Sequence, residues 1–167
     1  MKYSIYKPNA SSSGCAMSLN ISENNDLFLN MVLQSSWDNA TKTGSFKENA
    51  KNPDKTIAVK FNANEAGALI NSIENYLPAS FFHSYEGRKL QIRFTPWTKN
   101  EKDIAAAINE NKTPPDPVRA FGINVTRNSV DQFRMPIEIG EAYVLKILLT
   151  NFINRQLSIG AESTPSE

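Results

Sequence analysis

An internal duplication is the feature that most constrains the fold of this 167-residue chain. A shift of 76 residues aligns the alternating apolar and polar side chains of residues 57–61 with those of residues 133–137. The same shift aligns the helical pattern of residues 65–76 with residues 141–152 without a gap. A strand repeats every two residues and a helix about every 3.6, so a shared helix bias alone does not explain the match. The chain is therefore predicted to contain two copies of one structural unit.

Each copy is predicted to consist of four strands followed by one helix. Alternating apolar side chains indicate the strands, and apolar positions three and four residues apart indicate the helices. The first copy has predicted strands at residues 3–7, 15–21, 27–35 and 57–61 and a helix at about 65–77. The second has predicted strands at residues 81–85, 89–97, 119–127 and 133–139 and a helix at about 141–157. Residues 37–55 are predicted to form a polar loop, and residues 98–117 an insertion with a short helix near 103–109.

The pattern predicts an α+β fold in which two antiparallel sheets pack together with a helical core. A four-stranded antiparallel sheet with one apolar face needs a cover, and one amphipathic helix covers it only in part. The two copies, at about residues 2–78 and 79–158, are therefore expected to share one core in a single domain of residues 1–159. The polar tail, residues 160–167, is predicted to be disordered and is a candidate site for a protein partner.

The second helix is apolar around most of its circumference, which is typical of a helix that is buried on most sides. We therefore expect it to pack against copies of itself from other subunits. The predicted subunit contacts are Tyr143, Ile147, Leu148 and Phe152.

Composition argues against several functional classes. The formal net charge is +1, so a nucleic-acid-binding protein of this composition must concentrate its cations locally. The chain has one cysteine and one histidine, no glycine-rich phosphate loop and no cluster of metal ligands, so we expect neither a cofactor nor an enzyme. Catalysis by carboxylates alone is the enzymatic alternative. The start of the chain lacks the pattern of a secretory signal and no apolar run predicts a membrane helix, which favours a cytoplasmic protein of a bacterial or virus-infected cell.

Two segments resemble the Whirly family of single-stranded DNA-binding proteins. Residues 80–89 contain Phe81-Phe82-His83, which is similar to the Phe-Phe-His signature that follows the first helix of that family. Residues 133–152 are similar to its last strand and helix, and the order of elements agrees over about residues 2–158. The resemblance implies two packed antiparallel sheets, a helical core and a homotetramer that binds single-stranded DNA along the sheet edges with little sequence preference.

The chain departs from the family on an early strand, where the lysine-glycine-lysine-alanine motif is missing. The equivalent region runs from Tyr6-Lys7-Pro8 to Gly14-Cys15-Ala16, and only Lys7 can stand for the basic residues of the motif. Tyr6 and Lys7 are therefore the nucleic-acid contacts predicted for this region. Any higher-order assembly that depends on the motif is not expected.

Further candidate contacts follow from the side chains that alternation turns away from the core. Single strands are held by rings that stack on bases and by cations that pair with phosphates. Residues 89–97 carry such groups on one face: Lys89, Gln91, Arg93 and Trp97. Phe28, Asn30 and Lys60 lie on the polar faces of other strands, Trp37 opens the lysine-rich loop, and Arg127 ends the strand of residues 119–127. All are expected to form one continuous groove.

The sequence therefore predicts a single-stranded DNA-binding protein that acts in replication, recombination, repair or transcription. Two alternatives remain open at this point. One is binding of single-stranded RNA, because recognition of the ribose hydroxyl depends on geometry. The other is an oligomeric scaffold that binds no nucleic acid, which the near-neutral charge favours.

Overall fold

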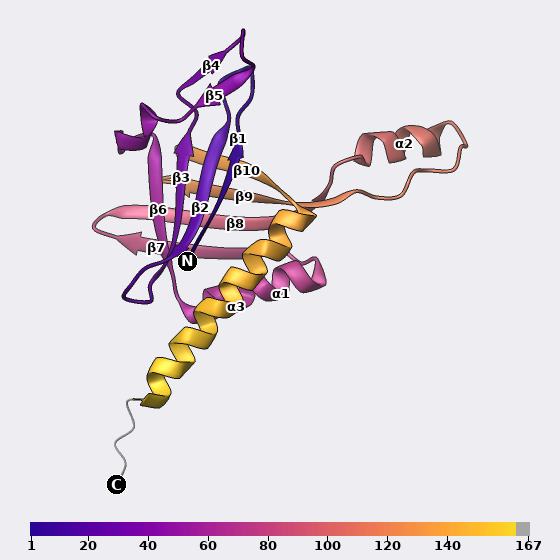
Figure 1. Cartoon of the computed structure of the whole chain (residues 1–167). Coiled ribbons are helices and arrows are strands. Elements are labelled where there is room, and N and C mark those ends of the chain that lie inside the picture. The colour runs from indigo at the N-terminus through magenta and orange to yellow at the C-terminus, as the bar shows by residue number, and fades with distance from the viewer. Residues whose placement is uncertain (163–167) are drawn as a thin grey trace.

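The computed structural model describes the backbone of residues 1–162 and the side chains of residues 1–158, and it contains two four-stranded antiparallel sheets (Figure 1). Sheet 1 has the strand order β1-β2-β3-β6, and sheet 2 has the order β7-β8-β9-β10. The strands of sheet 1 are β1 (Lys2–Lys7), β2 (Cys15–Ile21), β3 (Leu27–Leu33) and β6 (Thr56–Phe61). Those of sheet 2 are β7 (Ala79–Tyr85), β8 (Arg88–Thr98), β9 (Arg119–Arg127) and β10 (Asp131–Glu138). The predicted fold class, with its repeated unit of four strands and a helix, is confirmed.

One helix follows the last strand of each sheet. Helix α1 (Ala63–Asn75) begins with a capping box, in which the Asn62 side chain accepts a hydrogen bond from the Glu65 amide at 2.9 Å. The Glu65 carboxylate accepts one from the Asn62 amide at 3.0 Å, so two free N–H groups at the helix start are paired. The helix ends before Tyr76, whose φ of 54° lies in the left-handed region.

Helix α3 (Ile139–Glu162) begins earlier and ends later than the sequence pattern indicates. Ile139 was predicted to end the last strand, and that prediction is wrong. The Glu141 carboxylate accepts a hydrogen bond from the Glu138 amide at 2.8 Å, so the chain turns into the helix directly after Glu138. Residues 160–162 of the predicted tail continue the helix, and residues 163–167 lie outside the described part of the chain.

The core lies between the inner faces of the two sheets and is closed on one side by α1 and α3. The strands of sheet 1 run across those of sheet 2 at a steep angle, and both helices lie at the same side of the crossing (Figure 1). Leu148 and Phe152 of α3 belong to this core, with only 3% and 2% of their surfaces exposed. Their predicted role as subunit contacts is therefore wrong, because they already pack inside their own chain.

Two insertions interrupt the repeats at different places. Residues 37–55, predicted to be a loop, contribute to a short hairpin of β4 (Ser36–Asp38) and β5 (Thr43–Ser45) and contain a helical turn, η1 (Asn49–Lys51). Between β8 and β9, helix α2 (Glu101–Asn109) sits on an arm that projects from the body of the molecule (Figure 1). Within residues 1–162, no helix combines the length and apolar character that a membrane span requires.

Candidate nucleic-acid interface

The outer face of sheet 2 carries four of the predicted contacts. On β8, Ile92 and Phe94 are buried, whereas Lys89, Gln91, Arg93 and Trp97 are exposed. The alternation therefore turns these four side chains away from the core, as predicted. Trp97 is 41% exposed, which leaves one side of its indole accessible.

Neighbouring strands extend this surface in both directions. Arg93 lies opposite Asn124 of β9, and Asn124 lies opposite Arg134 of β10. Because adjacent strands are about 4.8 Å apart, the backbones at Arg93 and Arg134 are separated by roughly 10 Å. On the other side, Phe82 of β7 lies opposite Gln91 and is 65% exposed. We call this surface the platform: Phe82, Lys89, Gln91, Arg93, Trp97 and Arg134.

Sequence reasoning missed Phe82 and Arg134, although the signal was present. Phe82 stands between Phe81 and His83, whose side chains are partly buried, and Arg134 stands between two buried apolar residues. Alternation on β7 and β10 would have placed both on the outer face. The Phe-Phe-His signature as a whole does not indicate that its second ring points outward, whereas alternation along β7 does.

The platform is locally basic although the chain is nearly neutral. Within the described residues, Lys89, Arg93 and Arg134 form no ion pair. The one carboxylate at the margin, Glu138 of β10, accepts hydrogen bonds from the Lys99 ammonium at 2.8 and 3.0 Å. These bonds hold the pKa of Glu138 below its ordinary value. The outer face of sheet 2 therefore presents cations that have no acidic partner on the same face.

The remaining predicted residues do not join the platform, so the expected single groove is wrong. Tyr6, Phe28, Asn30 and Lys60 lie on the outer face of the other sheet, sheet 1. Trp37 lies on the β4–β5 hairpin, where its indole N–H donates to Asn39 at 3.2 Å. The predicted contacts are thus divided between surfaces formed by different sheets.

Several of these side chains are already bound within the chain. The Lys60 ammonium pairs with Asp26 at 2.7 Å, and the Asn30 amide donates to Asn20 at 3.0 Å. The Lys7 ammonium lies 2.7 Å from a carboxylate oxygen of Glu141, so it joins β1 to α3. These groups differ from Lys89 and Arg93, which have no such partner in the described structure.

Arg127 is placed differently from every other predicted contact. Its guanidinium donates hydrogen bonds to the carbonyl oxygens of Pro53, Asp54 and Thr56 at 2.8–3.2 Å. It also pairs with the Asp131 carboxylate at 2.8 Å, and its side chain is only 12% exposed. Its position at the end of β9 turns it toward sheet 1, so the structure assigns it to holding the two sheets together and not to the nucleic-acid interface.

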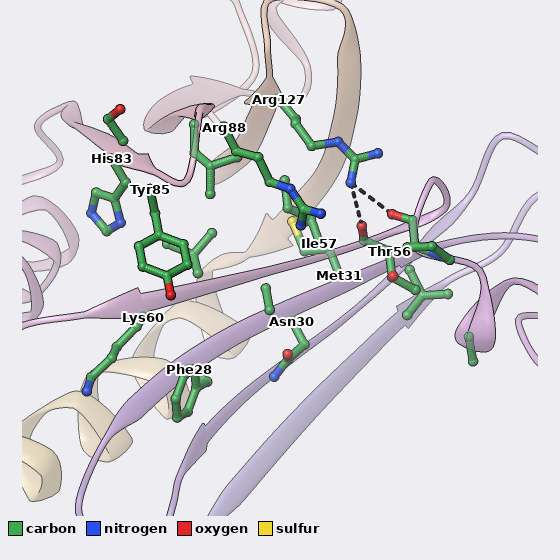
Figure 2. A pocket seen from close by; sticks show the side chains of 17 residues that line it. Phe28, Asn30, Met31, Thr56, Ile57, Lys60, His83, Tyr85, Arg88 and Arg127 are labelled. Atoms are coloured by element: carbon green, nitrogen blue, oxygen red, sulfur yellow. Dashed lines mark hydrogen bonds between the residues drawn. The ribbon is translucent and has the colours of Figure 1, made fainter.

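A groove of about 940 Å³ lies where the edge of sheet 1 approaches the β7–β8 turn (Figure 2). That turn has only two residues between the strands, Glu86 and Gly87, with φ of 46° and 74°, a backbone that suits a tight hairpin. It places Tyr85 and Arg88 over β6, while Phe28 and Asn30 lie on the other side of that strand (Figure 2). His83, at the end of the groove, bonds Glu65 at the start of α1 at 2.6 Å.

Comparisons with known proteins identify the fold and no family. No family model matches the sequence, and no curated protein matches it. The structure is similar to a chain from the structure of a guide-RNA-binding protein complex bound to a gRNA, with a TM-score of 0.60 and 15% sequence identity. The match covers 93% of this chain and 91% of that chain. At this identity the similarity shows a shared fold, and the resemblance to the Whirly family stays a prediction.

Proposed function

We propose that the chain binds single-stranded nucleic acid on the platform, with little sequence preference and without chemical turnover. The observation that carries the proposal is the grouping of Arg93, Arg134 and Lys89 with two exposed rings, Phe82 and Trp97, on one open sheet face. Rings of this kind stack on any base, and cations beside them pair with the phosphates. The fold neighbour described above is a guide-RNA-binding protein complex bound to a gRNA, which adds support.

The rings and cations of the platform determine the expected affinity for a single strand and its dependence on salt. Each base that stacks on an aromatic ring contributes about 1–3 kcal/mol as measured by alanine substitution. Neutralisation of phosphates by the three platform cations predicts a slope of log K against log salt of roughly −2 for a single strand. Duplex bases are stacked on each other, so their faces are not available to Phe82 and Trp97, and duplex is expected to bind less tightly.

The predicted ligand is single-stranded DNA, and single-stranded RNA is the alternative. Titration of fluorescent oligo-dT, oligo-rU and a duplex of equal length at two salt concentrations tests both. We expect at least one of the single strands to bind more tightly than the duplex, with affinity falling as salt rises. Equal binding of all three, or none, would contradict the proposal and favour the scaffold alternative. An intact oligonucleotide after long incubation supports binding without turnover.

Substitutions on the platform connect the binding to the residues. We expect Trp97→Ala and Arg93→Ala to weaken oligonucleotide binding without unfolding the protein, because both side chains are exposed. Lys102→Ala on the exposed arm removes a cation of the same charge away from the platform and serves as the matched control. If both platform variants bind as the parent does, the strand lies elsewhere.

We also propose that the chain assembles into a homo-oligomer, as the sequence predicts, through the part of α3 that remains exposed. Tyr143, Val144 and Ile147 form an apolar patch near the start of the helix, and Ile147 is 62% exposed. Apolar patches of this kind are typical of protein contacts. The expected assembly is a tetramer.

A further inference from the structure

The edge strand of sheet 1, β6, has backbone groups that point away from its partner strand. The Lys55 carbonyl accepts a hydrogen bond from the amide of Leu33, the last residue of β3, whereas the Thr56 carbonyl accepts from Arg127 on the opposite side. Backbone groups alternate in direction along a strand, so those of Ala58 and Lys60 point the same way as Thr56. In the described part of the chain, these two N–H and two C=O groups have no hydrogen-bond partner.

The groove runs along this free edge. Its lining includes consecutive residues of β6, from Thr56 to Lys60, whose side chains lie on both faces of the sheet. A cavity meets both faces of a strand only when it follows the edge. Tyr85 and Arg88 rise over β6 on one side (Figure 2), and Ala50 and Pro53 lie near its start. The free edge of β6 therefore lies inside the groove, where an extended segment can reach it.

The chemistry of the groove indicates what such a segment contains. Its lining has aliphatic side chains on the side of the core, such as Ile57 and Leu90. The charged residues of the lining are Lys60, Arg88 and Arg127, and no described carboxylate lines it. An added strand presents alternate side chains to the two sides. A segment in which apolar and acidic residues alternate therefore complements both the aliphatic side and Arg88, the lining cation that forms no ion pair in the described structure.

The polar groups favour a peptide over a nucleic-acid strand at this place. Asn30, Lys60 and Arg127 are already bound to Asn20, Asp26 and main-chain carbonyls. Along β6 itself, the groups that remain unpaired in the described structure are amide and carbonyl groups two residues apart, which match the hydrogen-bonding groups of another extended chain. Phosphate oxygens accept hydrogen bonds and do not donate them, so phosphates cannot pair with the carbonyl groups of this row.

The duplication places a proline at the equivalent edge in the second repeat. Residue 60 plus the shift of 76 is residue 136, and Pro136 lies on β10, the matching edge strand of sheet 2. Proline has no N–H and is tolerated at sheet edges, where it discourages further pairing. Lys60 at the matching position of β6 keeps its N–H, so this edge is open to one more strand.

We propose that the groove along β6 binds an extended, acidic and apolar peptide segment of a partner protein, which adds to sheet 1 as a fifth strand. Main-chain hydrogen bonds to Ala58 and Lys60 supply the pairing. The Arg88 side chain at the lip of the groove attracts the acidic side chains. This site is separate from the platform and does not depend on nucleic-acid binding.

A fluorescent peptide of about seven residues with alternating valine and glutamate tests the proposal by polarisation titration against the full chain. We expect saturable binding, and at least about a tenfold loss of affinity for Ala58→Pro, which removes one of the free N–H groups. Ala58→Ser keeps that amide and is expected to bind as the parent does. Addition of the peptide is also expected to slow hydrogen exchange at the Ala58 and Lys60 amides.

Two further measurements use the unchanged protein and therefore test the proposal even if Ala58→Pro does not fold. The same peptide methylated on alternate backbone nitrogens is expected to lose affinity for the unchanged protein, because its N–H groups no longer pair with β6. A peptide of alternating valine and lysine is expected to bind at least tenfold more weakly. Absence of saturable binding, equal binding of the methylated peptide, or displacement of the peptide by oligo-dT from the groove overturns the proposal. Normal oligonucleotide binding by Ala58→Pro separates this test from that of the platform.

Discussion

Arg127→Met removes the guanidinium that joins the two sheets and keeps an apolar side chain of similar length. The guanidinium bonds three main-chain carbonyls that are 71–74 residues away along the chain, and it pairs with Asp131. If this assignment is right, the substitution destabilises the fold and leaves oligonucleotide affinity unchanged. If Arg127 is instead a nucleic-acid contact, the substitution weakens oligonucleotide binding and leaves the stability of the fold unchanged.

The size of the effect depends on how well water replaces the lost donors. Pro53 and Asp54 are exposed, so their carbonyls regain partners from solvent, whereas Thr56 is only partly exposed. Three bonds at about 1 kcal/mol each, with a small contribution from the partly exposed ion pair, give a loss of roughly 2–4 kcal/mol. That loss lies well below the cost of an uncompensated buried charge, because methionine is uncharged and the Asp131 carboxylate that loses its partner is 45% exposed.

Urea unfolding followed by circular dichroism measures this loss, and oligonucleotide titration below the transition measures binding. Arg93→Met is the matched control, because its guanidinium is exposed and has no ion-pair partner in the described structure. For the control we expect a stability change within about 0.5 kcal/mol and weaker binding. A free energy of unfolding within about 0.5 kcal/mol of the parent for Arg127→Met would refute the reasoning.

Three side chains, Phe82, Cys15 and Ile147, support further predictions. Phe82→Ala is expected to weaken oligonucleotide binding by about 1–3 kcal/mol, measured by polarisation, while the melting temperature stays unchanged because the ring is mostly exposed. Burial raises the pKa of the Cys15 thiol from 9.0 to about 12, so the native protein is expected to resist iodoacetamide at pH 8 and to react after unfolding, as read by mass spectrometry. Since the unfolded thiol ionises near pH 9 and the folded one does not, stability to urea is expected to fall as the pH rises from about 9 toward 12. Ile147→Asp is expected to reduce the mass of the assembly in light scattering, whereas an unchanged mass would exclude the exposed patch of α3 as the subunit contact.

The strands could be predicted because each has one buried face, so the sequence alternates. The pattern located β2 and β9 to the residue and β8 to within one residue at each end. The hairpin of β4 and β5 was missed because strands of three residues are too short to show a period. The surfaces that alternation defines, including the outer face of β8, were therefore predictable, and irregular segments were not.

Contacts between segments that are distant along the chain could not be predicted from the alternation of apolar and polar residues. The sequence predicts Arg127 as a nucleic-acid contact, because nothing local indicates that its carbonyl partners lie more than 70 residues earlier. The side on which helix α3 packs could not be predicted from the sequence either. When apolar residues surround a helix, their spacing does not reveal which side packs on its own chain, so Leu148 and Ile147 could not be separated before the structure placed one inside and one outside.

The duplication connects the two proposed surfaces through one pair of strands. Arg134 and Pro136 of β10 correspond to Ala58 and Lys60 of β6, because each pair differs by the shift of 76 residues. On β10, one position adds a cation to the platform and the other places a proline at the sheet edge. On β6, the small side chain and the intact amide leave the edge open and accessible. The repeated strand therefore has a proline at the edge beside the basic face of sheet 2 and an open edge in the groove of sheet 1. The effect of an Arg134 substitution on oligonucleotide binding does not predict the effect of an Ala58 substitution on peptide binding.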